Sequence, residues 1–195
     1  MARSKEFDTT EVLHKAMEVF GYYGYEGTSL QNLLDGLGIA RQSLYDTYGT
    51  KRDLFIKAVK QYVEGKSSAA AAYLASADSV KTAVADIFQT IVSVLQNEEQ
   101  RKECLILHSA IDQVPHDPEI AALFEKDRQL LEQAFYDALV RGQARGELGP
   151  NQDLHALARY LYHARYGLTQ AAKLSNDPQV LEDISAVVLS TLNRC

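Results

Sequence analysis

The chain has 195 residues, of which 46% are hydrophobic and 24% are charged, and its formal net charge at pH 7 is −6. These fractions are ordinary for a soluble globular protein, and the length allows either one domain or a small domain followed by a larger one. No apolar run reaches the roughly 18 residues that a membrane span needs, and the two cysteines, Cys104 and Cys195, do not make a disulfide framework, so we expect a cytoplasmic protein without a membrane partner.

The first predicted helix begins near Asp8 and ends at Gly24. Asp8 and Glu11 form a possible capping box at its start. Gly24 is expected to end the helix because glycine readily takes the left-handed conformation of a helix C-terminus. The apolar residues between them recur at helical spacing and are Val12, Ala16, Val19, Phe20 and Tyr23.

The next stretch, from Thr28 to Tyr48, is predicted to be a helix-turn-helix. Thr28 and Gln31 have the spacing of a capping box, and a leucine-rich helix follows. Gly38 permits a sharp turn into a second short helix, which packs back through Leu44. The other face of that second helix carries side chains that suit base edges and phosphates, which are Arg41, Gln42, Ser43 and Tyr45.

This stretch resembles the DNA-binding domain of the TetR family of bacterial transcriptional regulators. The resemblance covers about the first third of the chain, and the remainder is similar only in length and helical character. Family members often have Ser or Thr where Ala40 stands, and alanine cannot cap a helix with a side-chain oxygen. The matching positions are Gly24-Tyr25, Thr28-Ser29, Gly38-Ile39, Leu44-Tyr45 with Tyr48, and Lys51 before Asp53-Leu54.

Positive charge gathers locally around the predicted recognition helix. Residues 1–60 hold 8 Lys+Arg and 8 Asp+Glu, so the excess of negative charge lies in residues 61–195. A small DNA-binding face on an acidic body would have this distribution, and a solvated helix pair is the alternative. Lys51 adds its charge to the free amides at a helix start, which makes a good phosphate site. The candidate DNA-binding residues are Thr28, Arg41, Gln42, Ser43, Tyr45, Tyr48 and Lys51.

Residues 51–195 are predicted to form a larger helical ligand-binding and dimerisation domain, after a helix-turn-helix domain in residues 1–50. A helix from Lys51 to about Ala75 leaves the first domain and enters the second. Further helices are expected from about residue 79, from Glu103 to Val114 after the polar run Gln96–Lys102, and from about residues 117, 151 and 177. The predicted fold class is therefore all-α, with about nine helices.

The last two predicted helices, about Asn151–Leu174 and Asp177–Asn193, are expected to form a homodimer interface. Both carry more apolar residues than the stripe of about 100° that a surface helix requires. Two such pairs related by a two-fold axis would make a four-helix bundle. The candidate interface residues are Leu157, Leu161, Leu168, Ile184, Val187 and Val188.

Cys104 and His108 lie one turn apart on a predicted helix, and three interpretations compete there. The simplest is a buried cysteine beside a satisfied histidine. An imidazole that lowers the thiol pKa would instead make a redox or electrophile sensor, and a metal site would need a third ligand that the sequence does not show. Other candidates for a small-molecule site are Phe88, Phe124, Tyr136, His163 and Tyr166.

The resemblance implies a homodimeric, ligand-responsive regulator, expected to be a repressor that a small-molecule inducer releases from a palindromic double-stranded DNA operator. The sequence has no phosphate-cradling glycine loop, no Gly-x-Ser-x-Gly and no His-Glu-x-x-His, so we expect neither an enzyme nor a cofactor or metal. Two alternatives stay open. One is a thiol-based regulator that senses through Cys104, and the other is a ligand-binding or interaction protein whose helix-turn-helix no longer reads DNA.

Overall fold

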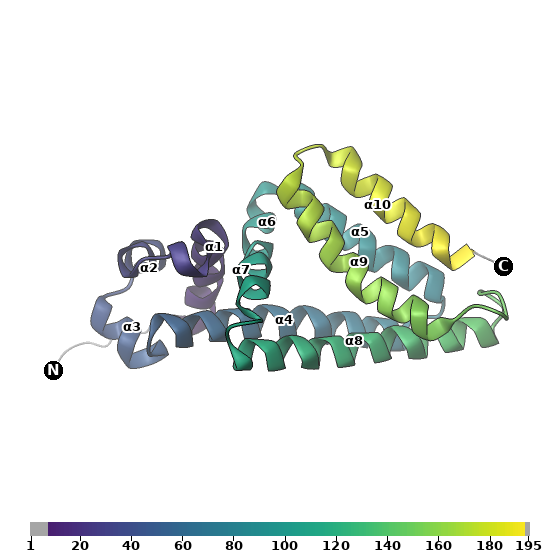
Figure 1. Ribbon diagram of the computed structural model, residues 1–195, viewed down its shortest axis with the longest axis horizontal. Coiled ribbons are helices and arrows are strands. Elements are labelled where there is room, and N and C mark those ends of the chain that lie inside the picture. Colours follow the sequence, from purple (N-terminus) through teal and green to yellow (C-terminus); the bar gives the residue numbers. More distant parts are fainter. Residues whose placement is uncertain (1–7, 194–195) are drawn as a thin grey trace. The chain divides into compact units, whose positions relative to one another are not determined.

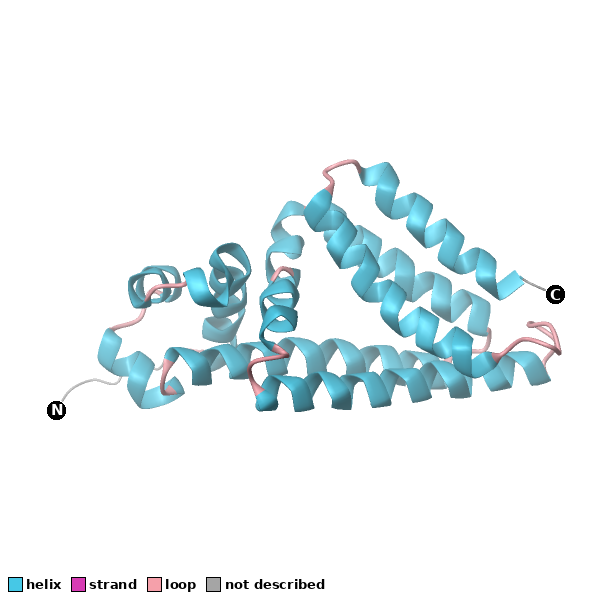
Figure 2. Ribbon diagram, viewed as in Figure 1, coloured by secondary structure: helices cyan, strands magenta, loops and turns pink. Residues whose placement is uncertain are grey.

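The computed structural model describes residues 8–193, and this part of the chain is helical throughout, with loops between the helices and no strand (Figure 2). The predicted all-α fold class is confirmed. The predicted N-terminal tail and Cys195 lie outside the described residues. The helices are α1 (Thr9–Gly27), α2 (Leu30–Leu37), α3 (Arg41–Tyr48), α4 (Lys51–Ser76), α5 (Val80–Gln96), α6 (Glu98–Cys104), α7 (Ile106–Gln113), α8 (Pro118–Ala144), α9 (Leu154–Leu174) and α10 (Pro178–Ser190), followed by a 3₁₀ turn, Thr191–Asn193.

Two compact units make up the fold, and the chain passes between them within α4, α6 and α8 (Figure 1). The first unit contains the chain up to Val63 and the segment Lys102–Leu123. The second unit contains Glu64–Arg101 and the chain from Phe124 onward. The predicted functional boundary at residue 50 stays a prediction, because these units are defined by packing and not by activity.

In the first unit, α1 packs against both α2 and α7. The Phe20 and Phe55 rings meet edge to face, with centroids 4.9 Å apart, and both side chains are buried. Gly21 lets α1 approach the junction between α6 and α7 very closely. A Cβ atom at this position would lie 2.9 Å from the Lys102 carbonyl oxygen and 2.9 Å from the Leu105 Cβ atom. The segment Lys102–Leu123 is therefore packed with the N-terminal helices as part of one core.

In the second unit, α5 packs against α9 and α10, and α10 packs against α9 (Figure 1). The apolar faces of these helices and of α8 supply the core. Phe88, Phe135, Leu161 and Leu168 are fully buried, and Val188 is buried with them. Within residues 8–193, no helix combines the length and the apolar character that a membrane span requires.

Most helix starts lie where the capping signals predicted them. Asp8, Ser79, Asp153 and Asp177 each accept a hydrogen bond from a backbone N–H of the first helical turn. The predicted capping box at Thr28 and Gln31 was wrong by one residue. Ser29 is the N-cap of α2, and its side chain and that of Asn32 satisfy each other's backbone amides.

The polar run that was expected to be a simple stop forms the short helix α6. Asn97 starts it, because its Oδ1 accepts hydrogen bonds from the backbone N–H groups of Glu99 and Gln100. The predicted helix Glu103–Val114 is interrupted at Leu105, where α6 gives way to α7. The Asn97 cap therefore starts a helix in addition to those that the apolar periodicity predicted.

Candidate nucleic-acid interface and effector region

The turn between α2 and α3 has the geometry that the sequence predicts. Gly38 has φ 66° and ψ 29°, a left-handed conformation, and its N–H donates to the Leu34 carbonyl at 3.0 Å. Ala40 is the N-cap of α3 and supplies no side-chain cap, as alanine must. The buried Leu44 side chain fixes the rotation of α3 about its axis. The opposite face of this short helix is consequently left to solvent.

Arg41, Gln42 and Tyr45 lie on that exposed face, and Ser43 is half-buried beside them. The Arg41 guanidinium carbon is 5.8 Å from the centroid of the Tyr45 ring, a cation–π distance. Gln42 donates from Nε2 to Asp46 Oδ1 at 2.7 Å, one turn further along α3. Two donors that suit base edges therefore project from the first turn of α3, each held by a neighbour on the same helix.

Thr28 and Tyr48 differ from the other candidate DNA-binding residues, because both side chains are buried, with 2% and 3% exposed. The Thr28 hydroxyl donates to the Gly24 carbonyl at 2.5 Å, across the kink where Gly24 has φ 74°. The Tyr48 hydroxyl donates to the Thr9 carbonyl at 3.3 Å, and burial raises its pKa. Both residues help to hold the helical bundle together, and burial disfavours their contact with DNA, which stays a prediction.

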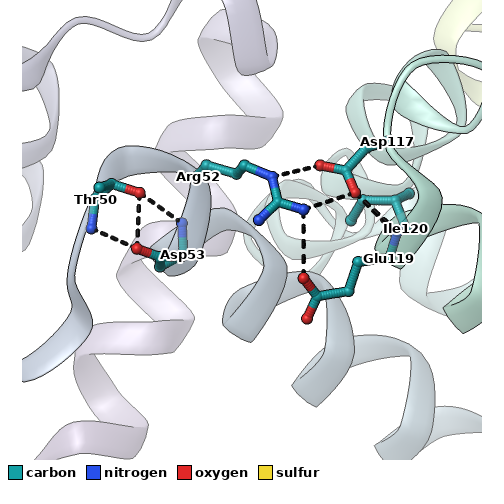
Figure 3. A network of polar contacts seen from close by, with 6 residues as sticks. All are labelled: Thr50, Arg52, Asp53, Asp117, Glu119 and Ile120. Atoms are coloured by element: carbon teal, nitrogen blue, oxygen red, sulfur yellow. Dashed lines mark hydrogen bonds and ion pairs between the residues drawn. The ribbon is translucent and has the colours of Figure 1, made fainter.

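The first turn of α4 gathers several polar contacts (Figure 3). Thr50 and Asp53 form a capping pair, in which Thr50 donates from its N–H and its hydroxyl to Asp53 Oδ2, each at 2.8 Å, and accepts from the Asp53 N–H at 3.2 Å. These hydrogen bonds lower the pKa of Asp53. The Lys51 ammonium lies 4.7 Å from the centroid of the Tyr25 ring. Lys51 is thus placed at a helix N-terminus, where backbone amides favour an anion.

Arg52, the next residue, faces the start of α8 in the same unit (Figure 3). It donates from Nε to Asp117 Oδ2 at 2.7 Å and from Nη2 to Asp117 Oδ1 at 2.9 Å, and Glu119 Oε2 lies 3.3 Å from Nη2. Asp117 also accepts from the N–H groups of Glu119 and Ile120, so it caps α8. The Arg52 hydrogen bonds hold the pKa of Asp117 below its usual range. This two-point contact joins the starts of α4 and α8.

Cys104 and His108, the predicted sensor pair, are both buried. The Tyr62 hydroxyl donates to the Cys104 sulfur at 2.9 Å. Burial limits the access of an oxidant or electrophile to the thiol, so sensing through Cys104 stays a prediction. Across residues 8–193, no three His, Cys, Asp or Glu side chains gather where they could hold a metal ion.

The second unit contains a buried polar cluster that the sequence did not single out. Asp127 of α8 has a side chain that is 1% exposed, and its Oδ2 accepts from the hydroxyls of Tyr162 and Tyr166, each at 2.9 Å. Its Oδ1 accepts from the Ser67 hydroxyl of α4. Burial raises the pKa of both tyrosines, so their hydroxyls stay protonated and act as donors. The guanidinium of Arg165 completes the cluster, 5.1 Å from the Tyr162 ring centroid and 5.4 Å from that of Tyr166.

The predicted small-molecule residues divide around this cluster. Tyr166 belongs to it, and the Phe124 ring lies 6.1 Å from the Tyr166 ring. Phe88 is a core residue of α5, Tyr136 stacks on His155 with centroids 4.0 Å apart, and His163 is exposed. Sequence reasoning missed Asp127, Ser67, Tyr162 and Arg165. The available signal was the spacing of Tyr162, Arg165 and Tyr166, which places two hydroxyls and a charge on one helical face.

An exposed groove runs between α9 and α10 of the second unit, lined mainly by apolar side chains. Val187 of α10 is 60% exposed and Tyr160 of α9 is 41% exposed. Three of the predicted interface residues do not reach this surface, because Leu161, Leu168 and Val188 are buried within the unit. The groove is lined by Gln152, Asp153, Ala156, Leu157, Tyr160, Val187 and Thr191, while Ile184 is half-buried.

Comparison with known proteins agrees with this arrangement. Residues 12–58 match the model of the bacterial regulatory proteins of the tetR family, and residues 81–188 match the model of the tetracyclin repressor-like C-terminal domain. The chain is 57% identical over 194 residues to the uncharacterized HTH-type transcriptional regulator YezE of Bacillus subtilis strain 168, covering 99% of this chain and 100% of the relative. It is 28% identical to the HTH-type transcriptional repressor ComR of Escherichia coli K12, over 96% of this chain and 90% of the relative.

Among solved structures, the fold is similar to that of the TetR family transcriptional regulator CifR. A cysteine mutant of CifR complexed with 26-bp double-strand operator DNA has a TM-score of 0.81, 28% sequence identity, and coverage of 96% of this chain and 98% of that chain. The helix-turn-helix geometry, the two matched family models and the closely similar YezE sequence all lead to one conclusion. The chain belongs to the tetR family of bacterial regulatory proteins.

Proposed function

We propose that this protein is a repressor that binds a palindromic DNA operator as a homodimer and leaves it when a small effector binds the second unit. The observation that carries the proposal is the outward face of α3, where Arg41 and Gln42 project after the left-handed turn at Gly38. CifR supports it, since that regulator is described as complexed with operator DNA. A protein with this activity acts in the cytoplasm, where the DNA is, and its task needs no catalytic group.

On DNA, Arg41 and Gln42 of α3 contact base edges, and Ser43 and Tyr45 contact the backbone or a base edge. Lys51 contributes a phosphate contact at the start of α4, where its charge adds to the helix N-terminal amides. The Thr50–Asp53 pair satisfies part of that first turn and keeps the helix start in place. Thr28 and Tyr48 are left out of this surface because their side chains are buried.

The groove between α9 and α10 is the surface we propose for dimerisation, and Leu157, Tyr160 and Val187 are the large side chains that line it. An exposed, contiguous apolar surface on a soluble chain is usually covered by a partner. A two-fold axis through it would place the same surface on both subunits and would match the two half-sites of a palindrome. The proposed interface thus keeps the two helices that the sequence predicted, but the residues that face the partner are those that line the groove.

Substitution of the recognition helix tests DNA binding. A duplex from the region upstream of the chain's own gene is titrated with each variant at two salt concentrations. Arg41→Ala should weaken binding by about 1–3 kcal/mol and relax the sequence preference. Lys51→Ala should weaken all duplexes alike and flatten the salt dependence. Lys173→Ala, a change of the same charge on α9, should bind as the parent does, and parental affinity in all three variants would refute the proposal.

Sedimentation of a Val187→Arg variant tests the dimer. Placing a charge in the centre of an apolar interface buries it once in each subunit, so the parent should sediment as a dimer and the variant as a folded monomer. Val140→Arg is the matched control, because Val140 is an exposed valine of α8 outside the groove. A parent that is monomeric at micromolar concentration, or a Val187→Arg variant that stays dimeric, would exclude this groove as the interface.

A further inference from the structure

Arg165 is a nearly buried cation whose hydrogen-bonding capacity is largely unused. Its side chain is 14% exposed, and its buried Nε–H has no hydrogen-bond partner within the described part of the chain. The Asp127 carboxylate is the nearby counter-charge, but its Oδ2 lies 3.6 Å from Arg165 Nη2, which is longer than a hydrogen bond. A guanidinium presents five N–H donors in a planar fork. The part of the Arg165 fork that carries Nε–H therefore lacks an acceptor.

Three hydroxyls already donate hydrogen bonds to the Asp127 carboxylate, so it is satisfied without a hydrogen bond from Arg165. Tyr162 and Tyr166 donate to Oδ2, and Ser67 donates to Oδ1. The guanidinium is instead held by the negative charge at 3.6 Å and by the faces of the two tyrosine rings. The fold therefore neutralises the charge of Arg165 while leaving donors of its fork available.

An unmet donor of this kind is costly in a protein interior, because it has lost its hydrogen bonds to water without gaining a protein acceptor. Structural arginines usually meet this need by two parallel hydrogen bonds to a carboxylate, as Arg52 does with Asp117 in this same chain. Arg165 lacks that arrangement, although a carboxylate is close by. The chemistry that would complete it is a planar oxyanion supplied from outside the chain.

We propose that the cluster of Ser67, Asp127, Tyr162, Arg165 and Tyr166 is the effector-recognition site and that it takes a small monocarboxylate with an aromatic or apolar body. This inference rests on the proposed ligand-responsive function and specifies its ligand. The carboxylate accepts from the Arg165 fork. The Phe124 and Tyr166 rings pack on each other, with centroids 6.1 Å apart, and together supply apolar surface for the rest of the ligand.

The charges of the cluster set the preference for a single negative charge. Asp127 and Arg165 together are neutral, so a monoanion adds one charge that the guanidinium balances directly. A dianion such as phosphate would bring a second charge near the Asp127 carboxylate, which repels it. A cation would have to displace Arg165 from the two rings, and a neutral amide would gain only the weaker hydrogen bonds of an uncharged acceptor.

The experiment uses three small benzene derivatives, which are benzoate, its planar neutral isostere benzamide and the cation benzylamine. Their binding to the whole protein is measured by titration calorimetry at constant ionic strength. The variants are Arg165→Gln and Arg165→Lys, and Arg159→Gln is the matched control because Arg159 is an exposed arginine of the same helix. Circular dichroism verifies that each variant is folded. Arg165→Lys keeps the positive charge but loses the planar fork, so it separates charge from geometry.

Benzoate should bind the parent and Arg159→Gln with equal affinity. It should bind both Arg165 variants at least about tenfold more weakly than the parent. Benzamide should bind the parent at least about tenfold more weakly than benzoate does. Absence of benzoate binding, equal binding of benzoate and benzamide, stronger binding of benzylamine, or unchanged benzoate affinity in the Arg165 variants would each overturn the proposal. DNA release is measured separately. Arg165-dependent binding that does not release DNA would leave this site standing and contradict the ligand-responsive function.

Discussion

Two carboxylates, one at the start of α8 and one within it, are stabilised by the fold in opposite ways. Asp117, in the first unit, has a side chain that is 15% exposed and accepts two hydrogen bonds from the Arg52 fork. Asp127, in the second unit, is 1% exposed and accepts from three neutral hydroxyls, with the nearest arginine beyond hydrogen-bond length. The more accessible carboxylate has the tight ion pair, and the buried one does not.

This difference indicates separate roles for the two sites. Asp117 also caps α8, so its ion pair joins two helix starts and its geometry is complete within the chain. At Asp127, the hydrogen bonds come from neutral hydroxyls. The Nε–H of the neighbouring Arg165 has no acceptor within residues 8–193. A buried polar network in which every group is satisfied mainly specifies packing, whereas one with an unmet donor is suited to a ligand.

The largest expected effect comes from removing the buried carboxylate. Asp127→Ala should lower the free energy of unfolding by about 3–5 kcal/mol, because it leaves the Arg165 charge without its counter-charge and three hydroxyls without their acceptor. Urea denaturation measures this change. Asp137→Ala, at an exposed position of the same helix, should change stability by less than about 0.5 kcal/mol. A similar change in the free energy of unfolding for the two variants would contradict a larger contribution from the buried carboxylate than from an accessible one.

Removal of a single donor to Asp127 should have an intermediate effect. Tyr162→Phe deletes one hydroxyl that donates to the buried carboxylate and should lower the free energy of unfolding by about 1.5–3 kcal/mol. Tyr22→Phe is the control, since the Tyr22 side chain of α1 is 79% exposed, and it should be close to neutral. If both variants unfold at the parental urea concentration, the hydroxyls do not support Asp127 and the cluster has been misinterpreted.

Asp117 is expected to contribute less, and two variants separate its roles. Asp117→Ala removes both the cap of α8 and the acceptor of Arg52, and should lower the free energy of unfolding by about 0.5–2 kcal/mol, mostly through the cap. Asp117→Ser keeps a capping oxygen but removes the charge, so thermal unfolding should show that it retains most of the parental stability. A loss in Asp117→Ser equal to that in Asp117→Ala would mean that the ion pair, and not the cap, dominates.

The smallest expected effect concerns how the free energy of unfolding decreases as the pH is lowered into the acid range. Because the pKa of Asp117 is lowered in the folded state, its contribution is fully present above the unfolded pKa of about 3.9 and is lost as the pH falls through the lower folded value. Asp117→Asn should therefore make stability fall less steeply with acidification below about pH 4, and Arg52→Gln should reduce the same slope. Urea unfolding across this pH range tests it, and a parental slope in both variants would show that the pair does not persist in solution.

The order of the helices and their capping residues could be predicted from the sequence, because these features depend on residues within one turn of each other. The left-handed Gly38, the Thr50–Asp53 pair and the uncapped Ala40 were all visible as local patterns. Even there the prediction was wrong at α2. Two adjacent residues, Thr28 and Ser29, were both competent caps, and the backbone conformation selected Ser29.

Periodicity predicted which helical faces are apolar but not what covers them. Leu161, Leu168 and Val188 have the same pattern as Leu157 and Val187, yet the first three are buried within the second unit and Val187 remains exposed. A helical stripe wide enough for two partners does not indicate which half faces which partner. That choice depends on the packing of α5, α9 and α10 against one another.

The sequence by itself determined that the chain is all-helical, that it carries a helix-turn-helix with Arg41 and Gln42 on one face, and that it resembles the family to which it belongs, since these follow from short-range spacing and local chemistry. Only the tertiary structure decided that Thr28 and Tyr48 are buried and that Ser67, Asp127, Tyr162, Arg165 and Tyr166 form one cluster. The reason is physical. The members of that cluster come from three helices far apart in sequence, and burial and hydrogen bonding between them arise only when those helices pack together.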